Sequence, residues 1–266
     1  LQRLTDEVTG SLETFQYGEA GRRVRDFLWD EFCDWYIEAT KVRLYDDAAD
    51  KGTPLAVLLT VLEQSLRLLH PFMPFVTEAL WQALPASAKS GEALIIAAWP
   101  EADVTRLDDV AEAQMGVLME LVRGIRNVRA EYNVEPGRRI PALIAAGELA
   151  PALEARRPVL ELLARLDPTT LTLTAQAEPP AQAASVVVGD AAAYLPLAGL
   201  VDLDAERARL QKALAQLEGH IQGSRAKLGG PFAEKAPADV VAAARQRLAE
   251  MEAEAAQLRE QLGRLG

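Results

Sequence analysis

Apolar residues recur at helical spacing through the first half of the chain. The first set comprises Val24, Phe27, Leu28, Phe32, Trp35 and Tyr36, and similar spacing continues over 54–69, 75–84 and 112–132. One apolar face per helix predicts a bundle of four or five helices over residues 1–134. The steps His70-Pro71 and Met73-Pro74 predict a break between two of these helices.

Short β-rich runs replace the helical pattern between residues 135 and 200. They are RIPALIAA (139–146), TTLTLTA (169–175), SVVVG (185–189) and YLPL (194–197), and Gly, Pro or Asp separates them. Residues 151–166, between the first two runs, are predicted to form one helix. The segment therefore predicts a small α/β module, and the pattern leaves its sheet order open.

Heptads begin at residue 201 and continue to the end of the chain. The first series is Leu203, Leu210, Leu214, Leu217, Ile221 and Leu228, and the second has Val241, Leu248, Ala255 and Leu262 at a with Ala244, Met251, Leu258 and Leu265 at d. The Gly/Pro-rich stretch 229–237 separates the two series. This pattern predicts an antiparallel coiled-coil hairpin over 201–266, with arms of about 27 residues and roughly 40 Å. The predicted fold class is mainly α: a helical bundle, a small α/β module and a hairpin.

Charge is distributed unevenly among these segments. The chain has 28 Lys and Arg against 39 Asp and Glu, a net charge of −11, which on a uniform surface would oppose binding of phosphates. Residues 1–110 hold 10 basic and 19 acidic residues, residues 111–199 hold 8 and 10, and residues 200–266 hold 10 and 10. The acidity therefore lies in the first helices, and the predicted hairpin is neutral overall.

Two groups of basic residues are candidates for binding phosphate. Because screening limits a charge to about 8 Å at physiological salt, a local basic stripe can act on an acidic protein. The alternative interpretation of each group is a solvated helix face with ion pairs. One group recurs every three residues on a predicted helix, and the other clusters around the hairpin turn: Arg123, Arg126 and Arg129, and Arg225, Lys227, Lys235, Arg245 and Arg247.

Motifs for catalysis, cofactors or metals do not occur in the sequence. It has no phosphate-binding G-x-x-x-x-G-K-[ST], no G-x-G-x-x-G followed by an acid, no G-x-S-x-G and no H-E-x-x-H. His70 and His220 are too isolated for a metal site, and the acidic run from Asp30 to Glu38 lacks the histidines of a carboxylate metal centre. The residues alone therefore indicate a binding or structural protein without catalytic, cofactor or metal residues.

The remaining single residues favour structural roles and an intracellular setting. Cys33 lies between large apolar residues and is predicted to be a packed thiol, and the four tryptophans are predicted to be core or core-edge residues. One cysteine and no long apolar run predict a cytoplasmic protein without a membrane segment. Since the chain begins at Leu1 inside a helical pattern, we expect a fragment of a longer protein.

Several strings resemble a known family. WDEFCDWYIEATK (29–41), LLHPFMPFVTEALWQAL (68–84) and GIRNVRAEYNVEPG (124–137) resemble the anticodon-binding domain of class I aminoacyl-tRNA synthetases of the Val/Ile/Leu group. KLGGPFAEKAPADVV (227–241) resembles the C-terminal arm of the valyl-tRNA synthetases. The resemblance covers essentially the whole chain, but the HIGH and KMSKS signatures of the catalytic domain do not occur. We therefore expect a chain that begins just inside the anticodon-binding domain.

The resemblance implies a role in binding tRNA(Val). The bundle is expected to take the anticodon stem and loop through the arginines at 123, 126 and 129, and the hairpin to lie along the outer corner of the tRNA. There Arg247 is the first expected contact and Arg225 and Lys227 are the next. The parent enzyme is expected to join valine to tRNA with ATP and Mg²⁺, through an N-terminal catalytic domain that this monomeric, inactive fragment lacks.

Two alternatives stay open. The chain is either the equivalent region of another synthetase of the Ile/Leu group, or a non-enzymatic coiled-coil scaffold that pairs with protein helices. A scaffold is expected to expose apolar residues at e or g positions. Here those positions are mostly Ala, Gln, Arg and Glu, which favours a solvated arm.

Overall fold

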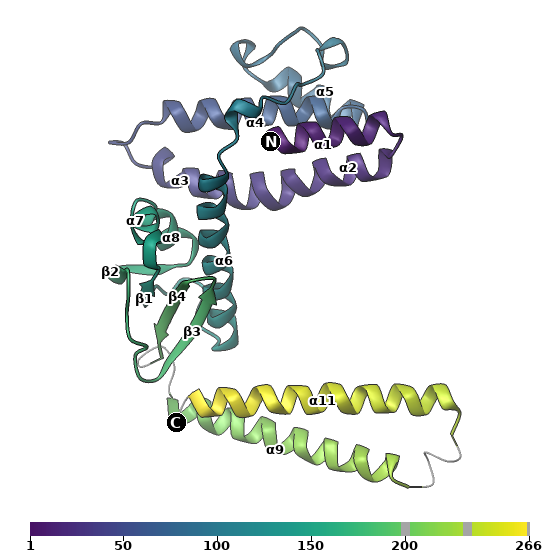
Figure 1. The fold of residues 1–266 in the computed structure, drawn as a ribbon, viewed down its shortest axis with the longest axis vertical. Coiled ribbons are helices and arrows are strands. Elements are labelled where there is room, and N and C mark those ends of the chain that lie inside the picture. Colours follow the sequence, from purple (N-terminus) through teal and green to yellow (C-terminus); the bar gives the residue numbers. More distant parts are fainter. Residues whose placement is uncertain (198–202, 231–235, 265–266) are drawn as a thin grey trace. The chain divides into compact units, whose positions relative to one another are not determined.

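The computed structural model describes residues 1–197, 203–230 and 236–264. The chain forms two compact units, Leu1–Met119 with Ala155–Leu163, and Glu120–Glu154 with Ala164–Gly266. Figure 1 shows the helices, the small sheet and the two-helix hairpin that make up these units. Within the described part of the chain, no helix is both long and apolar enough to cross a membrane.

The first unit is helical, as the spacing of apolar residues predicts. Helix α1 (Gln2–Glu13) is followed by α2 (Tyr17–Asp26), which continues through the π-helical stretch η1 (Phe27–Ile37) into α3 (Glu38–Leu44). Then come α4 (Gly52–Leu69), α5 (Pro74–Ala83), three short 3₁₀ turns and α6 (Asp109–Glu131). The 3₁₀ turns are η2 (Ala86–Ala88), η3 (Leu94–Ile96) and η4 (Val104–Arg106).

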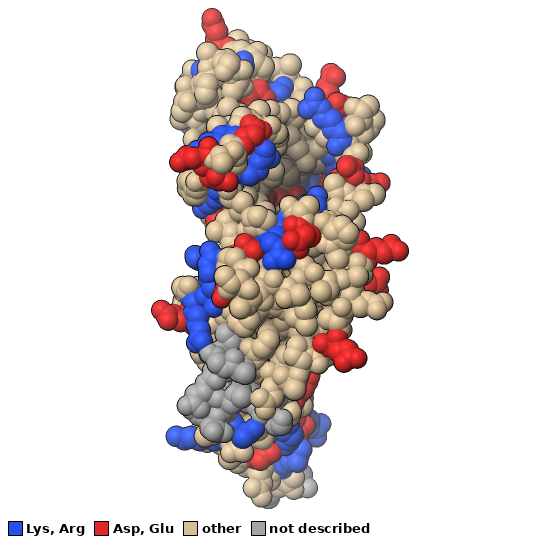
Figure 2. Space-filling view, turned by 90° about the vertical axis from the view of Figure 1, so that its left-hand side faces the viewer, with Lys and Arg blue, Asp and Glu red and all other residues tan. Residues whose placement is uncertain are grey.

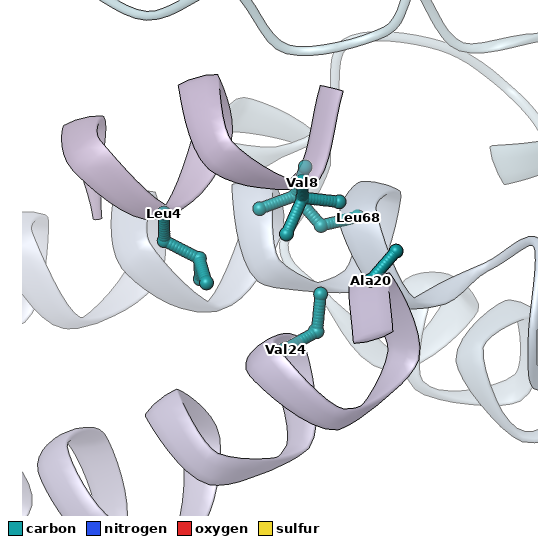
Figure 3. Close-up of a cluster of buried hydrophobic side chains, with 5 residues drawn as sticks. All are labelled: Leu4, Val8, Ala20, Val24 and Leu68. Carbon is teal, nitrogen blue, oxygen red and sulfur yellow. The ribbon is translucent and has the colours of Figure 1, made fainter. Parts of the chain in front are cut away.

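The core of this unit joins helices that are distant in sequence. Leu4 and Val8 of α1 pack with Ala20 and Val24 of α2 and with Leu68 of α4 (Figure 3). Each large aliphatic side chain buried in this way stabilises the fold by roughly 1.5–3 kcal/mol. A second cluster, formed by Leu66, Trp81 and Leu94, packs α4, α5 and η3 together.

The break after α4 is confirmed and is closed by a polar contact. His70 is the C-cap residue of α4, and Pro74 is the first residue of α5. The Thr77 hydroxyl donates to the Met73 carbonyl at 2.8 Å and lies 2.7 Å from Nδ1 of His70. The hydrogen bond between Nδ1 of His70 and the Thr77 hydroxyl therefore links the end of α4 to the first turn of α5.

Two predicted core residues are instead on the surface. Cys33 is exposed, and the Trp29 side chain keeps 68% of its surface, whereas Phe32 and Trp35 are buried. Successive residues of a helix are about a quarter of a turn apart, so a large apolar neighbour does not place a residue on its own face. The predicted packed thiol at Cys33 is therefore wrong.

The second unit contains a four-stranded sheet of order β2-β1-β4-β3. Strands β1 (Ile140–Ala145) and β2 (Leu166–Thr174) are parallel, and β4 (Ala191–Pro196) pairs antiparallel with both β1 and β3 (Ala183–Val188). The register of β1 against β2 shifts between Ile140 and Ala142. Pro168 lies in the matching part of β2, an edge strand, where a missing N–H is tolerated.

The single helix predicted over 151–166 is wrong. The structure has η5 (Gly147–Leu149) and two short helices, α7 (Ala150–Glu154) and α8 (Arg157–Leu163). Pro158 cannot donate to the carbonyl of Glu154, and its ring would clash there, so the first helix ends at Glu154.

The C-terminal half of α6 packs closely on the sheet at Gly124. A Cβ atom at this position would lie 2.2 Å from Cγ1 of Val186 in β3. Leu121, Val122 and Ile125 are fully buried around it. The glycine therefore allows the helix to approach the strand.

We expect Gly124→Ala to destabilise the protein by about 1–2 kcal/mol, because the added methyl overpacks this contact by more than helix propensity gains. Urea unfolding measures the change. Gly116→Ala on the same helix is the matched control, since it has open space and should stabilise by up to about 1 kcal/mol. Val186→Ala should restore the Gly124→Ala variant, and two glycine variants of equal stability would contradict the close contact.

The hairpin consists of α9 (Leu203–Leu228) and α11 (Ala238–Arg264), which run antiparallel side by side (Figure 1). Leu210 and Ile221 of α9 and Val241 and Ala255 of α11 are buried along the seam, so the predicted heptads are confirmed over the described residues, outside which Leu265 lies. Ser224 is half-buried and occupies a seam position of α9 that the predicted series of apolar residues does not include.

Candidate nucleic-acid interface

Ion pairs fix one edge of the hairpin. Arg225 donates from Nε at 2.9 Å and from Nη2 at 2.6 Å to Oε1 of Glu252, and Arg259 donates to Glu218 at 2.6 Å. The two pairs are seven residues apart on both helices, as a single antiparallel register requires. Arg225 is therefore held by a carboxylate of the other helix.

Heptad positions divide the polar flanks of the seam into two edges. With Val241 at a and Leu210 at d, the paired residues above occupy e positions, and the other flank consists of g positions. We name them the e edge and the g edge. The e edge is formed by Gln211, Glu218, Arg225, Arg245, Glu252 and Arg259, and the g edge by Ala213, His220, Lys227, Val240, Arg247, Glu254 and Gln261.

The register places two cations opposite each other on the g edge. In an α-helix each side chain leans toward the N-terminus of its own helix. Two side chains of an antiparallel pair therefore touch when each is attached slightly C-terminal to the level at which they meet. From the register set by Arg225 and Glu252 we infer that Lys227 lies opposite Arg247, and His220 opposite Glu254 one heptad further on. Cations gathered at one edge create a local positive potential that acts over about 8 Å at physiological salt. The g edge is therefore suited to phosphate near the turn.

The surroundings of these cations leave room for a nucleic-acid backbone. Arg245 and Arg247 are exposed, and neither is hydrogen-bonded or ion-paired to any described residue. Glu250, the nearest acid on the same helix as Arg247, accepts a hydrogen bond from Gln246 at 3.1 Å. A Cβ added at Gly223 would meet nothing within 4 Å. Lys235, a further predicted contact, lies outside the described residues.

The predicted arginine stripe on α6 does not form one face. Arg123 and Arg126 are exposed, but Arg129 is buried, with 6% of its surface accessible. Because an α-helix has about 3.6 residues per turn, a spacing of three rotates each successive residue by about 60°. By Arg129 that rotation has reached the face that buries Ile125 and Val128. The prediction that Arg129 contacts RNA is therefore corrected.

Arg129 instead holds the backbone that follows α6. Its Nη2 donates to the carbonyls of Glu135 at 3.1 Å and Pro136 at 3.4 Å, and its Nη1 lies 3.5 Å from the carbonyl of Arg165. Burial lowers the pKa of Arg129 from its ordinary value, and the nearby charge of Arg165 adds to this effect. The residue has a structural role in the second unit.

Carboxylates of the first unit are extensively ion-paired. Arg22 binds Glu19 and Asp26, and its hydrogen bond to Glu19 lowers the pKa of that carboxyl. The hydrogen bond from Arg25 likewise lowers the pKa of Asp26. On the face shown in Figure 2, basic and acidic side chains are interspersed. The acidic bundle therefore contains local ion pairs.

Among the described residues, no group of three or more His, Cys, Asp and Glu side chains is arranged to hold a metal ion. The acidic residues of η1 follow the helix surface without a histidine beside them. These residues do not fit the cofactors that the resemblance implies for the parent enzyme.

Matches to known families agree with both parts of this architecture. Residues 1–144 match the family model described as the anticodon-binding domain of tRNA ligase, which assigns the helical unit to the tRNA ligases. Residues 202–266 match the family model described as the valyl tRNA synthetase tRNA binding arm. The chain belongs to the valyl-tRNA synthetase family.

Similar curated proteins are named valine–tRNA ligase. The protein of Syntrophotalea carbinolica is 43% identical over 100% of this chain and 30% of its own length. Those of Bacillus subtilis and Dehalococcoides mccartyi are 40% and 44% identical over 91% and 93% of the chain, and over 27% and 28% of their own lengths. The chain therefore spans less than a third of these relatives.

Sequence reasoning missed the acidic partners on the e edge. Glu218 and Glu252 bind Arg259 and Arg225, and both acids stand at e positions of the predicted heptads. Because e positions face each other in antiparallel coiled coils, the heptad assignment carried the signal. The positions of the arginines alone did not show that two of them are paired with acids of the other helix.

Proposed function

We propose that this chain binds tRNA(Val) as part of a valine–tRNA ligase, through the g edge of its hairpin and the anticodon-binding bundle. The observation that carries the proposal is Arg247, which is exposed on the g edge and has no hydrogen bond or ion pair to a described residue. Phosphate contacts dominate RNA affinity, and double-stranded RNA is recognised by shape, phosphates and 2′-hydroxyls. A stiff hairpin with cations near its turn suits the outer corner of a tRNA.

The candidate contacts differ in what each can contribute. Arg247 is exposed and lies opposite Lys227, so these two are the principal contacts. Arg245 is on the e edge and contributes at longer range, and Arg225 is already neutralised by Glu252. On α6, Arg123 and Arg126 are the contacts proposed for the anticodon stem. We propose that the bundle comprises residues 1–134, the α/β module 135–200 and the arm 201–266.

The rest of the proposal concerns the parent enzyme. Attachment of valine, with ATP and Mg²⁺, is assigned to polypeptide outside these residues, and the chain alone is expected to be inactive. We also propose that the chain is monomeric and cytoplasmic. The single cysteine, which is exposed, and the charged residues at e and g positions of the hairpin support these assignments.

A titration with tRNA tests the function. We expect the chain to bind tRNA(Val) with an affinity that falls steeply between about 50 and 200 mM salt, because bound phosphates release counterions. Fluorescence anisotropy measures the affinity, and tRNA for isoleucine is the matched competitor. Binding that ignores salt, or none at all, would overturn RNA binding and favour the scaffold. Equal affinity for both tRNAs would remove only the specificity for valine tRNA.

A further inference from the structure

Helix α5 is apolar on the face that it exposes as well as on the face that it buries. Thr77 and Trp81 are fully buried on its inner side. The outer side has no charged residue; beside Gln82, whose amide donates to the carbonyl of Glu92, it consists of Phe75, Val76, Ala79, Leu80 and Ala83, which we name the α5 face. Phe75 keeps 90% of its surface and Leu80 keeps 48%. A helix surface that faces water normally carries charged or polar residues, so an exposed apolar side indicates a surface that is covered.

The neighbouring turn η3 extends this surface. The N–H of Leu94 donates to Glu78 at 2.8 Å, and the Gln82 amide donates to the carbonyl of Glu92 at 2.7 Å. These bonds hold η3 along one side of α5. Ile95 and Ile96 on this turn each keep 75% of their surface. The α5 face and η3 together therefore expose several large apolar side chains in one part of the first unit.

Other helix surfaces of the same unit are built differently. The exposed side of α2 carries Arg22, Arg25 and Glu19, and its ion pairs are typical of a surface that meets water. The α5 face has no such groups. A difference of this kind within one unit indicates that the two surfaces have different neighbours.

Polypeptide outside these residues is the available neighbour. The family relatives are more than three times as long as the matched region, because the chain spans 27% to 30% of their lengths. We propose that the α5 face, with Ile95 and Ile96, is the surface on which the remaining polypeptide of the synthetase docks, through an apolar segment of that polypeptide. RNA binding by the hairpin does not depend on what covers α5, so either assignment can fail alone.

Cysteine labelling tests this surface directly. Leu80→Cys is introduced in a Cys33→Ser background, since Cys33 is exposed and would react as well. Val104→Cys is the matched control, because Val104 is an aliphatic residue of the same unit that keeps 72% of its surface. Maleimide labelling is followed at each site by peptide mass spectrometry, in the isolated chain and in the full-length enzyme that contains it.

We expect Leu80→Cys to react at least about tenfold more slowly in the full-length enzyme than in the isolated chain, because burial leaves reaction only through local opening. Val104→Cys should react equally fast in both. Equal rates for Leu80→Cys in the two proteins would overturn the proposal. Slow labelling of Leu80→Cys in the isolated chain would also overturn it. If that slow rate depended on protein concentration, a second copy of the chain would be the cover. If it did not, the other unit of the same chain would be the cover.

A charged variant provides an independent readout. Leu80→Glu should lower the melting temperature of the full-length enzyme, because a carboxylate would be buried in an apolar interface, and should leave that of the isolated chain unchanged. Val104→Glu should change neither melting temperature. An unchanged full-length enzyme with Leu80→Glu would contradict docking at this face.

Discussion

Arg247→Glu should weaken binding of tRNA(Val) by about 1–3 kcal/mol, a five- to 150-fold rise in Kd. The guanidinium is exposed, is not paired with a described residue and lies opposite Lys227. Arg247→Gln should produce a smaller loss and reduce the salt slope of binding by about one, the signature of a single phosphate contact. Anisotropy titrations at several salt concentrations measure both quantities.

The matched control for Arg247 lies on the same helix. Arg245→Glu makes the same charge change two residues away, on the e edge, and should raise the Kd by no more than about threefold, through long-range electrostatics. If Arg245→Glu weakened tRNA binding as much as Arg247→Glu does, the positive charges near the turn would act together and neither edge would be preferred. If neither variant changed the affinity, the hairpin near its turn would not contact RNA.

Thermal unfolding adds a readout that a purely structural role for Arg247 would not give. Arg247 is exposed and is not paired with a described residue, so replacing it should cost the free hairpin little stability. Arg247→Gln should therefore keep the melting temperature while it weakens RNA binding. A lower melting temperature would indicate that Arg247 stabilises the hairpin.

Periodicity predicted most elements of this fold because helix and heptad patterns are local. The helices of the first unit and the seam through Leu210, Ile221 and Val241 follow directly from the spacing of apolar residues. Sheet order was not predictable, because strands β1 and β4 are far apart in sequence and pair through nonlocal contacts. The break at Pro158 could have been predicted, since proline is incompatible with the interior of one continuous helix.

The candidate site was only partly predictable, because residue type does not fix the direction of a side chain. Arg247 and Arg129 are both arginines on predicted helices, yet one is exposed and the other is buried. Heptad positions distinguish the two edges of the hairpin. The antiparallel register that pairs Arg225 with Glu252 depends on the turn, whose length no local pattern determines.

Arg129→Met should destabilise the protein by about 2–4 kcal/mol. Methionine keeps much of the side-chain volume but cannot donate hydrogen bonds, so the carbonyls of Glu135 and Pro136 lose their donor in part-buried contacts. Urea unfolding measures the loss. Arg126→Met, on the exposed side of the same helix, is the matched control and should change stability by less than about 1 kcal/mol.

The same pair of variants separates structure from RNA contact on α6. Below its unfolding transition, Arg129→Met should bind tRNA(Val) as the unmodified chain does, because the buried guanidinium cannot reach a phosphate. Arg126→Met should keep its stability and lose affinity, since the charge it removes is exposed. The reverse pattern, with stability unchanged and affinity lost at Arg129, would mean that this side chain turns outward when tRNA binds and that its carbonyl contacts are dispensable.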